Sequence, residues 1–240
     1  MPRVLMLVND IDSKPGTLVP WLLENHVEFD LRIGGVSDFP EPAALADYDG
    51  LVLLGGGYMP DEVDRAPWLA PEQALVAEAF RLDLPQLGIC LGGQMLAYVG
   101  GGEVKAKTGA VEKGYTPITL TPAAGEDPVF SGVRPATEFV ESHQDRITAL
   151  PQDAVLLASS ETCEIQAFRL GRAWGTQFHP EAGVDNLRRW NAERLAASGF
   201  DKEELIAHGE AITAEVVPDA RAIVDAFCTV VKDVVVKESV

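Results

Sequence analysis

The sequence predicts an α/β fold in which a doubly wound, mostly parallel sheet is flanked by helices and carries a small antiparallel addition. Two observations predict it. In the first part of the chain, continuous apolar runs typical of buried parallel strands alternate with segments of helical periodicity. Further along, short strand-like runs separated by tight turns indicate antiparallel pairs. Strand–helix alternation places helices on both faces of a sheet through right-handed crossovers.

The predicted strands of the first part are short apolar runs, except the one at 27–33, where apolar and polar residues alternate. The turn Pro15-Gly16 follows the first of them, and three consecutive glycines, Gly55 to Gly57, follow the third. The helix predicted at 71–84 has apolar residues at helical spacing and a proline near its start. We expect strands at 4–8, 27–33, 50–54 and 86–89, and helices at 18–23, 71–84 and 95–99.

The second part predicts a hairpin-rich region and then helices. Pro218 is expected to separate the last two helices, because proline breaks the backbone hydrogen-bond ladder, and residues 232–240 are expected to fray. We divide the chain into a domain at 1–190 and a helical C-terminal extension at 191–240 packed on that same domain. We expect strands at 116–121, 138–142, 155–158, 165–170 and 173–178, and helices at 186–196, 202–216 and 219–231.

Composition narrows the class of protein and of partner. The 240 residues suit one globular domain with a sizeable core, and the formal net charge of −18 argues against nucleic acid or an anionic membrane as a partner. No apolar run has the length of a membrane span, and the N-terminus has no secretory signal pattern. The three cysteines lack metal-type spacing, so we expect a reduced, cytoplasmic protein without a metal or another cofactor.

The stretch from Gln86 to Gln94 contains the strongest functional signal. An apolar strand runs into Cys90, and helix-forming residues follow. A nucleophile at a sharp strand-to-helix turn is the elbow arrangement of many hydrolases. Gly88 and Gly92 allow the backbone to close around a strained residue. Because Cys90 then lies at a helix N-terminus, the helix dipole favours its thiolate.

A second segment far downstream, Gly175 to Glu181, supplies a base and an acid. His179 offers an imidazole, and Glu181 offers a carboxylate that can orient it. Pro180 between them holds His179 in extended geometry. Together with Cys90 these residues predict a Cys-His-Glu triad.

The two motifs together resemble the class I (triad-type) glutamine amidotransferases. That family carries a G-x-C-x-G-x-Q elbow, matched by Gly88 to Gln94, and a Q-F-H-P-E segment, matched by Gln177 to Glu181. The resemblance spans residues 3–190 and extends to Gly55-Gly56-Gly57, to Ser142-His143 and to residues 165–168. It implies a flavodoxin-like sheet and a stand-alone member similar to the glutaminase portion of guanylate synthases.

The resemblance also assigns roles to residues outside the triad. It implies that the N–H groups of Gly56 and Leu91 form the oxyanion hole, beside the flexible Gly57, which stands where the family often has proline. The residues expected to bind the substrate are Gly55, Gly57, Gln94, Ser142 and His143, the last two largely through backbone groups.

Each residue also has a simpler structural interpretation. A lone Cys between apolar residues is often only a buried small side chain, and His143 at a strand end is often a surface residue. The triple glycine could be a turn or a phosphate loop, but no Lys-Ser/Thr follows it. The acidic loop 60–64 is expected to be solvated, like His26 and His208, and neither Cys163 nor Cys228 is given a role.

The leading hypothesis is an enzyme that hydrolyses L-glutamine through a glutamyl thioester and supplies ammonia to a separate synthetase or acceptor subunit. The sequence contains no Ser-Gly-Gly-x-Asp-Ser pyrophosphate loop, so we do not expect a fused ATP-using synthetase. A γ-glutamyl hydrolase with the same triad is the first alternative, and a non-catalytic regulatory module is the second. The C-terminal helices are a candidate surface for a partner or a homodimer.

Overall fold

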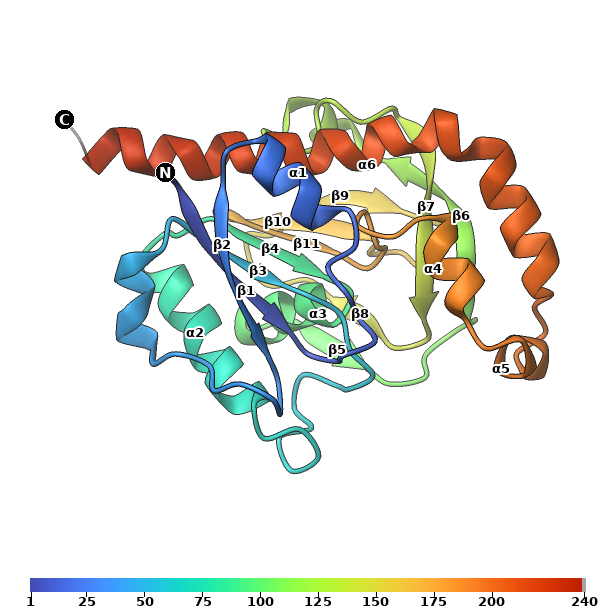
Figure 1. The fold of residues 1–240 in the computed structure, drawn as a ribbon, viewed down its shortest axis with the longest axis horizontal. Helices are drawn as coiled ribbons and strands as arrows, with labels where there is room; N and C mark the ends of the chain where they lie inside the picture. The colour runs from blue at the N-terminus through green and yellow to red at the C-terminus, as the bar shows by residue number, and fades with distance from the viewer. Residues whose placement is uncertain (239–240) are drawn as a thin grey trace.

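The computed structural model describes residues 1–238, with side chains through residue 234. Nine strands form one sheet in the order β2-β1-β3-β4-β11-β10-β9-β6-β7, and β5 and β8 form a second, small sheet. Figure 1 shows helices on both faces of the large sheet, with the long C-terminal helix running across one of them. The predicted fold class is confirmed.

The parallel half of the large sheet comprises β2 (Glu28–Ile33), β1 (Arg3–Val8), β3 (Gly50–Leu53), β4 (Gln86–Ile89) and β11 (Ala173–Thr176). Taking β11 as the fifth strand, this is the 2-1-3-4-5 order of flavodoxin-like sheets. Ligands in such sheets bind beyond the carboxyl ends of the strands. The connections after β3, β4 and β11 all leave from that edge, which is where the predicted site residues lie.

Two buried clusters cover the faces of the parallel half. Alternate residues of a strand point to opposite faces, so the residues of β1 divide between the clusters. Helix α1 (Leu18–Glu24) packs on one face, whereas α2 (Leu69–Arg81) and α3 (Leu91–Val99) pack on the other. From β1, the first cluster takes Val4, Met6 and Val8, and the second takes Leu5 and Leu7.

The antiparallel half consists of β10 (Ala167–Leu170), β9 (Val155–Ser159), β6 (Glu112–Leu120) and β7 (Ala136–His143). Figure 1 shows β6 and β7 turned across the rest of the sheet. A backbone bridge between Val140 and His179 joins edge strand β7 to the segment after β11. The sheet therefore curls so that its far edge meets the end of its central strand.

Several short elements were not predicted. Strands β5 (Glu103–Lys105) and β8 (Arg146–Ala149) pair with each other, and the two 3₁₀ helices η1 (Pro42–Asp47) and η2 (Pro122–Glu126) each begin with proline. These segments are too short for periodicity to separate them from loops.

The C-terminal helices differ from the prediction at Pro218. After α4 (Val184–Arg189) and α5 (Ala192–Ala197), α6 runs without interruption from Lys202 to Glu238 with Pro218 inside it. The expected break was therefore wrong. The expected fraying of the tail stays a prediction for residues 232–238, which are helical, and residues 239–240 lie outside the described residues. Arg134 binds Glu215 and Asp219 on either side of the proline, which adds contacts across this position.

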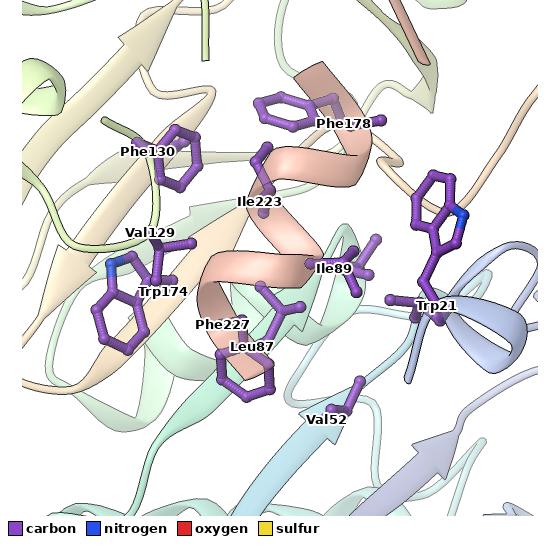
Figure 2. Packing of buried hydrophobic residues seen from close by; sticks show 14 of the residues in the cluster. Trp21, Val52, Leu87, Ile89, Val129, Phe130, Trp174, Phe178, Ile223 and Phe227 are labelled. Atoms are coloured by element: carbon purple, nitrogen blue, oxygen red, sulfur yellow. The ribbon is translucent and has the colours of Figure 1, made fainter. Parts of the chain in front are cut away.

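Helix α6 completes the main core. Ile223 and Phe227 are fully buried in the cluster that contains Leu87 and Ile89 of β4. Figure 2 shows these two α6 side chains pointing toward the strand residues, with Trp174 beside them. The division at residue 190 stays a prediction, although α6 contributes to the same core as the strands. Despite the length of α6, no helix in residues 1–238 combines the length and apolar character that crossing a membrane requires.

Candidate active site

Cys90 lies at the predicted elbow, between β4 and α3. Its backbone has φ 53° and ψ −109°, a conformation rarely adopted by residues other than glycine. Its N–H donates to the carbonyl of Thr176 at 2.7 Å, which ties the elbow to β11. A methyl group on Gly92 would lie 2.2 Å from the carbonyl oxygen of Leu53, so only glycine permits this close packing of helix and strand.

His179 and Glu181 form the second half of the site. Nδ1 of His179 lies 2.7 Å from Oε1 of Glu181. The backbone carbonyl of Glu181 accepts hydrogen bonds from the N–H and the hydroxyl of Thr17, at 3.0 and 3.1 Å. Phe178 stacks on Phe139 of β7 with ring centroids 4.1 Å apart. The loop that carries the imidazole is thus fixed by two separate parts of the fold, the segment before α1 and strand β7.

The two halves meet at Gly55. A methyl group on Gly55 would lie 3.2 Å from Cε1 of His179 and 3.5 Å from Cβ of Cys90. Nε2 of His179 is buried and makes no hydrogen bond within the described residues. Burial alone would lower the pKa of His179, but the charge of Glu181 and the neighbouring Cys90 sulfur raise it well above its ordinary value. This arrangement favours the imidazolium form of His179.

The two residues expected to form an oxyanion hole are neighbours. A methyl group on Gly56 would lie 3.1 Å from Cδ2 of Leu91 and 3.0 Å from Cβ of Asn9. Leu91 begins α3, so its N–H has no acceptor within the helix. Gly57 is more open, with only Asp10 Oδ2 at 3.8 Å from such a methyl group. The geometry suits N–H groups from two segments that converge near Cys90.

Gln94 is buried and is connected to Cys90 by contacts with a second glutamine, Gln177. Its amide nitrogen donates to the carbonyl of Asp145 and to Oε1 of Gln177, both at 3.1 Å. The amide nitrogen of Gln177 in turn lies 3.6 Å from the Cys90 sulfur. The sequence placed Gln177 only within the downstream motif. Its contact with the sulfur depends on β11 lying beside β4, which a local pattern does not reveal.

Ser142 and His143 end β7 and face opposite sides of it. The Ser142 hydroxyl accepts a hydrogen bond from Lys113 Nζ at 2.8 Å. The His143 ring is buried, so its alternative interpretation as a surface residue was wrong: Nε2 lies 2.7 Å from Glu112 and 3.2 Å from Glu141. Burial would lower the pKa of His143, but these carboxylates raise it to about 10. The ring is thus engaged with protein groups.

The surroundings of His143 contain ligand types that metals accept. Ligand atoms of Glu112, His143 and Cys163 lie within 4.8 Å of one another, all three residues being buried. Glu112 is already held by His143 and by hydrogen bonds from Ser160, Thr162 and Gln166. Protein groups therefore account for the charge of this carboxylate, and we interpret the cluster as a structural ion pair under the site.

A buried acid behind the triple glycine was also missed. Glu72 of α2 is fully buried and accepts a hydrogen bond from Asn9 Nδ2 at 2.9 Å. The same nitrogen of Asn9 lies 3.2 Å from the carbonyl oxygen of Leu54, which precedes the glycines. Burial raises the pKa of Glu72 to about 8. The available signal was helical spacing, because Glu72 lies three residues from both Leu69 and Leu75 and so falls on the apolar face of α2.

The remaining polar candidates lie outside this constellation. His26 is exposed, and His208 pairs with Glu138 at 2.7 Å on the surface. In the 60–64 loop, Glu62 accepts the N–H of Met59 and pairs with Arg65. Cys228 is buried in α6, where burial raises the pKa of its thiol to about 12.

Comparison with known proteins identifies the class to which this fold and site belong. The family model described as glutamine amidotransferase class-I matches residues 23–189, which include the elbow and the His-Pro-Glu segment. The chain belongs to the class I glutamine amidotransferases. The predicted family resemblance and enzyme class are confirmed.

Within this family the chain is similar to proteins named as a subunit of glutamine-hydrolyzing GMP synthase. The Sulfolobus acidocaldarius protein is 36% identical over 57% of this chain and 69% of its own length. That of Halobacterium salinarum is 33% identical over 61% of this chain and 73% of its own. A crystal structure described as a glutamine amidotransferase from Thermotoga maritima has a TM-score of 0.85 at 27% identity, covering 95% of this chain and 98% of the other.

Proposed function

We propose that this chain hydrolyses the side-chain amide of L-glutamine through Cys90, His179 and Glu181. The observation that carries the proposal is the 2.7 Å contact between His179 Nδ1 and Glu181, with Nε2 buried near an elbow cysteine of positive φ. Family membership supplies the reaction class.

In the first step, the Cys90 thiolate attacks the amide carbon and the carbonyl oxygen becomes an oxyanion. In this proposal the N–H groups of Gly56 and Leu91 donate to that oxyanion and stabilise its charge. The imidazolium of His179 then gives its proton to the amide nitrogen. The carbon–nitrogen bond breaks, ammonia leaves, and a glutamyl thioester remains on Cys90.

In the second step, water hydrolyses the thioester. His179, now neutral, takes a proton from the water as it attacks the thioester carbon. The carbon–sulfur bond breaks, glutamate is released and the thiolate–imidazolium pair is restored. Glu181 keeps the His179 imidazole in one tautomer and one orientation through both steps, because its carboxylate binds Nδ1 of the ring.

The amino-acid end of the substrate is assigned to five residues. An amide side chain and main-chain carbonyls suit an α-ammonium, and N–H groups suit an α-carboxylate. Gln94 supports this assignment because it is linked to Cys90 through Gln177. The set comprises Gly55, Gly57, Gln94, Ser142 and His143.

We further propose that the released ammonia passes to a separate synthetase subunit. The relatives are named as one subunit of GMP synthase, which supports a partner of that kind. The exposed surface of the C-terminal helices is the proposed contact for such a partner or for a second copy of this chain. A cytoplasmic location fits a nucleophile that must remain reduced.

The test is to follow glutamate and ammonia release from L-glutamine by the wild type, Cys90→Ala and Cys228→Ala. The last is a matched control, since it removes a buried thiol from α6. Release by the wild type and the control, with none from Cys90→Ala, supports the proposal. Cleavage of γ-glutamyl-GABA alone would favour a γ-glutamyl hydrolase. Inactivity, together with no labelling of Cys90 by a glutamine-like electrophile, would favour a non-catalytic module.

A further inference from the structure

Lys113 lies beside the site in a way that the proposed chemistry does not explain. It is directly opposite Ser142 in the antiparallel pair of β6 and β7. Its ammonium group donates to the Ser142 hydroxyl at 2.8 Å and lies 5.6 Å from the ring centroid of Trp190. A hydroxyl and an aromatic face therefore fix the position of this charge at the end of β7.

In the part of the chain that the structure describes, the charge of Lys113 has no carboxylate partner. Among the described residues, none of the ion pairs within 4.0 Å involves Lys113, although the chain has 37 acidic and only 19 Lys and Arg residues. By contrast, Lys105 on the neighbouring small sheet pairs with Glu103 at 3.1 Å. A partly buried ammonium without a counter-charge is costly to maintain. This cost favours the binding of an external anion beside Lys113.

Two features connect Lys113 with the reacting centre. Strand β7 carries Ser142 and, two residues earlier, Val140, whose carbonyl accepts the backbone N–H of His179 at 2.8 Å. Burial lowers the pKa of Lys113, while the negative charge of the Cys90 thiolate acts to raise it. The ammonium group is thus within the electrostatic reach of the nucleophile.

The Ser142 hydroxyl adds a second donor. Its oxygen accepts from Lys113, and its own proton has no acceptor among the described residues. A hydroxyl in this arrangement can donate to a ligand oxygen while the ammonium neutralises the ligand charge. Two oxygens of one carboxylate match a hydroxyl and an ammonium placed side by side.

We propose that Lys113, together with the Ser142 hydroxyl, binds a carboxylate of the substrate and so selects anionic γ-glutamyl compounds. The inference rests on the proposed function of the same site. The carboxylate can be the α-carboxylate of the glutamyl group or a carboxylate on the leaving amine. Both sources present the same chemistry to Lys113, and matched substrates distinguish them.

The experiment compares Lys113→Met, Lys113→Gln and Lys113→Arg with Lys105→Met, which removes an exposed and paired lysine. Kinetics are measured on L-glutamine and on L-glutamine α-amide, and then on γ-glutamylglycine and γ-glutamylmethylamide. Circular dichroism checks that each variant folds. Loss of a hydrogen bond to a charged group predicts a rise in KM of about tenfold or more.

If the ligand is the α-carboxylate, the neutral variants raise KM for L-glutamine but not for its α-amide, with kcat nearly unchanged. If the ligand is on the leaving amine, the effect appears with γ-glutamylglycine and not with γ-glutamylmethylamide. Lys113→Arg should recover part of the loss, because it restores the charge. Equal KM values for the wild type and both neutral variants on all four substrates would overturn the inference.

A binding measurement separates this inference from the proposed hydrolysis. Calorimetry titrates L-glutamine and γ-glutamylglycine into Cys90→Ala, with and without Lys113→Met. Binding that weakens about tenfold on loss of Lys113 supports the carboxylate subsite, even if the wild type hydrolyses neither compound. Hydrolysis that is indifferent to Lys113 would leave the proposed function standing and reject the subsite. Absence of both binding and hydrolysis would reject both.

Discussion

The backbone N–H of His179 donates to the carbonyl of Val140 at 2.8 Å, so the edge strand of the sheet holds the proposed catalytic base. Val140 lies in the antiparallel half, whereas Cys90 follows a parallel strand in the other half. The pairing of β11 with β4 brings the base to the nucleophile, and the curl of the sheet lets β7 hold the base from the far edge.

Glu181→Gln should reduce kcat for glutamine hydrolysis about 100-fold or more, because an amide does not stabilise the imidazolium as a carboxylate does. The charge of Glu181 also raises the pKa of His179. In the variant this pKa falls, so the alkaline limb of the pH–rate profile should move to lower pH. Glu210→Gln, a change at an exposed glutamate, is the control. An unchanged profile would argue that Glu181 does not act on the imidazole.

Gly92→Ala should destabilise the elbow strongly, because the added methyl group would lie 2.2 Å from the carbonyl oxygen of Leu53. We expect a loss of about 2–4 kcal/mol in the free energy of unfolding. Gly125→Ala is the matched control, since nothing lies within 4 Å of its added methyl group. Urea denaturation measures both, and equal midpoints for the two variants would contradict the packing seen at Cys90.

Glu72 should make the stability depend on pH. Its pKa in the folded state is raised to about 8 from 4.5 by burial, so the folded protein holds this proton more tightly than the unfolded chain. The contribution of neutral Glu72 to the free energy of unfolding is fully present below pH 4.5 and is lost as the pH rises through about 8. The loss amounts to about 5 kcal/mol at most, since one pKa unit corresponds to about 1.4 kcal/mol.

Glu72→Gln should remove this component, because glutamine keeps the shape of the neutral carboxyl and does not ionise. The free energy of unfolding of the variant, measured relative to the wild type, should therefore increase as the pH rises from about 5 to about 8. Glu126→Gln, at an exposed residue of η2, should leave the pH dependence unchanged. Parallel curves for Glu72→Gln and the wild type would show that Glu72 titrates normally.

Phe227→Ala should cost about 3–5 kcal/mol of folding free energy, since its ring is fully buried in the main core. Val217→Ala on the same helix is the control, because that side chain is 38% exposed. Thermal and urea unfolding measure both. A loss below about 1 kcal/mol for Phe227→Ala would mean that α6 does not form part of the domain core.

Prediction from sequence was accurate where a short window carries the constraint. The apolar runs identified β1, β3 and β4 within a residue or two. The glycines and the cysteine identified the elbow, because a positive φ at Cys90 and close helix–strand packing restrict the residue types that fit. It failed at Pro218, where the helix continues despite the lost hydrogen bond. There, core packing of α6 outweighs a local preference.

The sequence by itself determined the fold class and the family, and it supplied the proposed triad of Cys90, His179 and Glu181. Each of these depends on residue type and spacing within a few positions. Only the tertiary structure decided which distant groups meet: Lys113 with Ser142, His143 with Glu112, and Asn9 with Glu72. The physical reason is that strand register and the curl of the sheet set these pairs, and both result from the packing of the whole core rather than from any short stretch of chain.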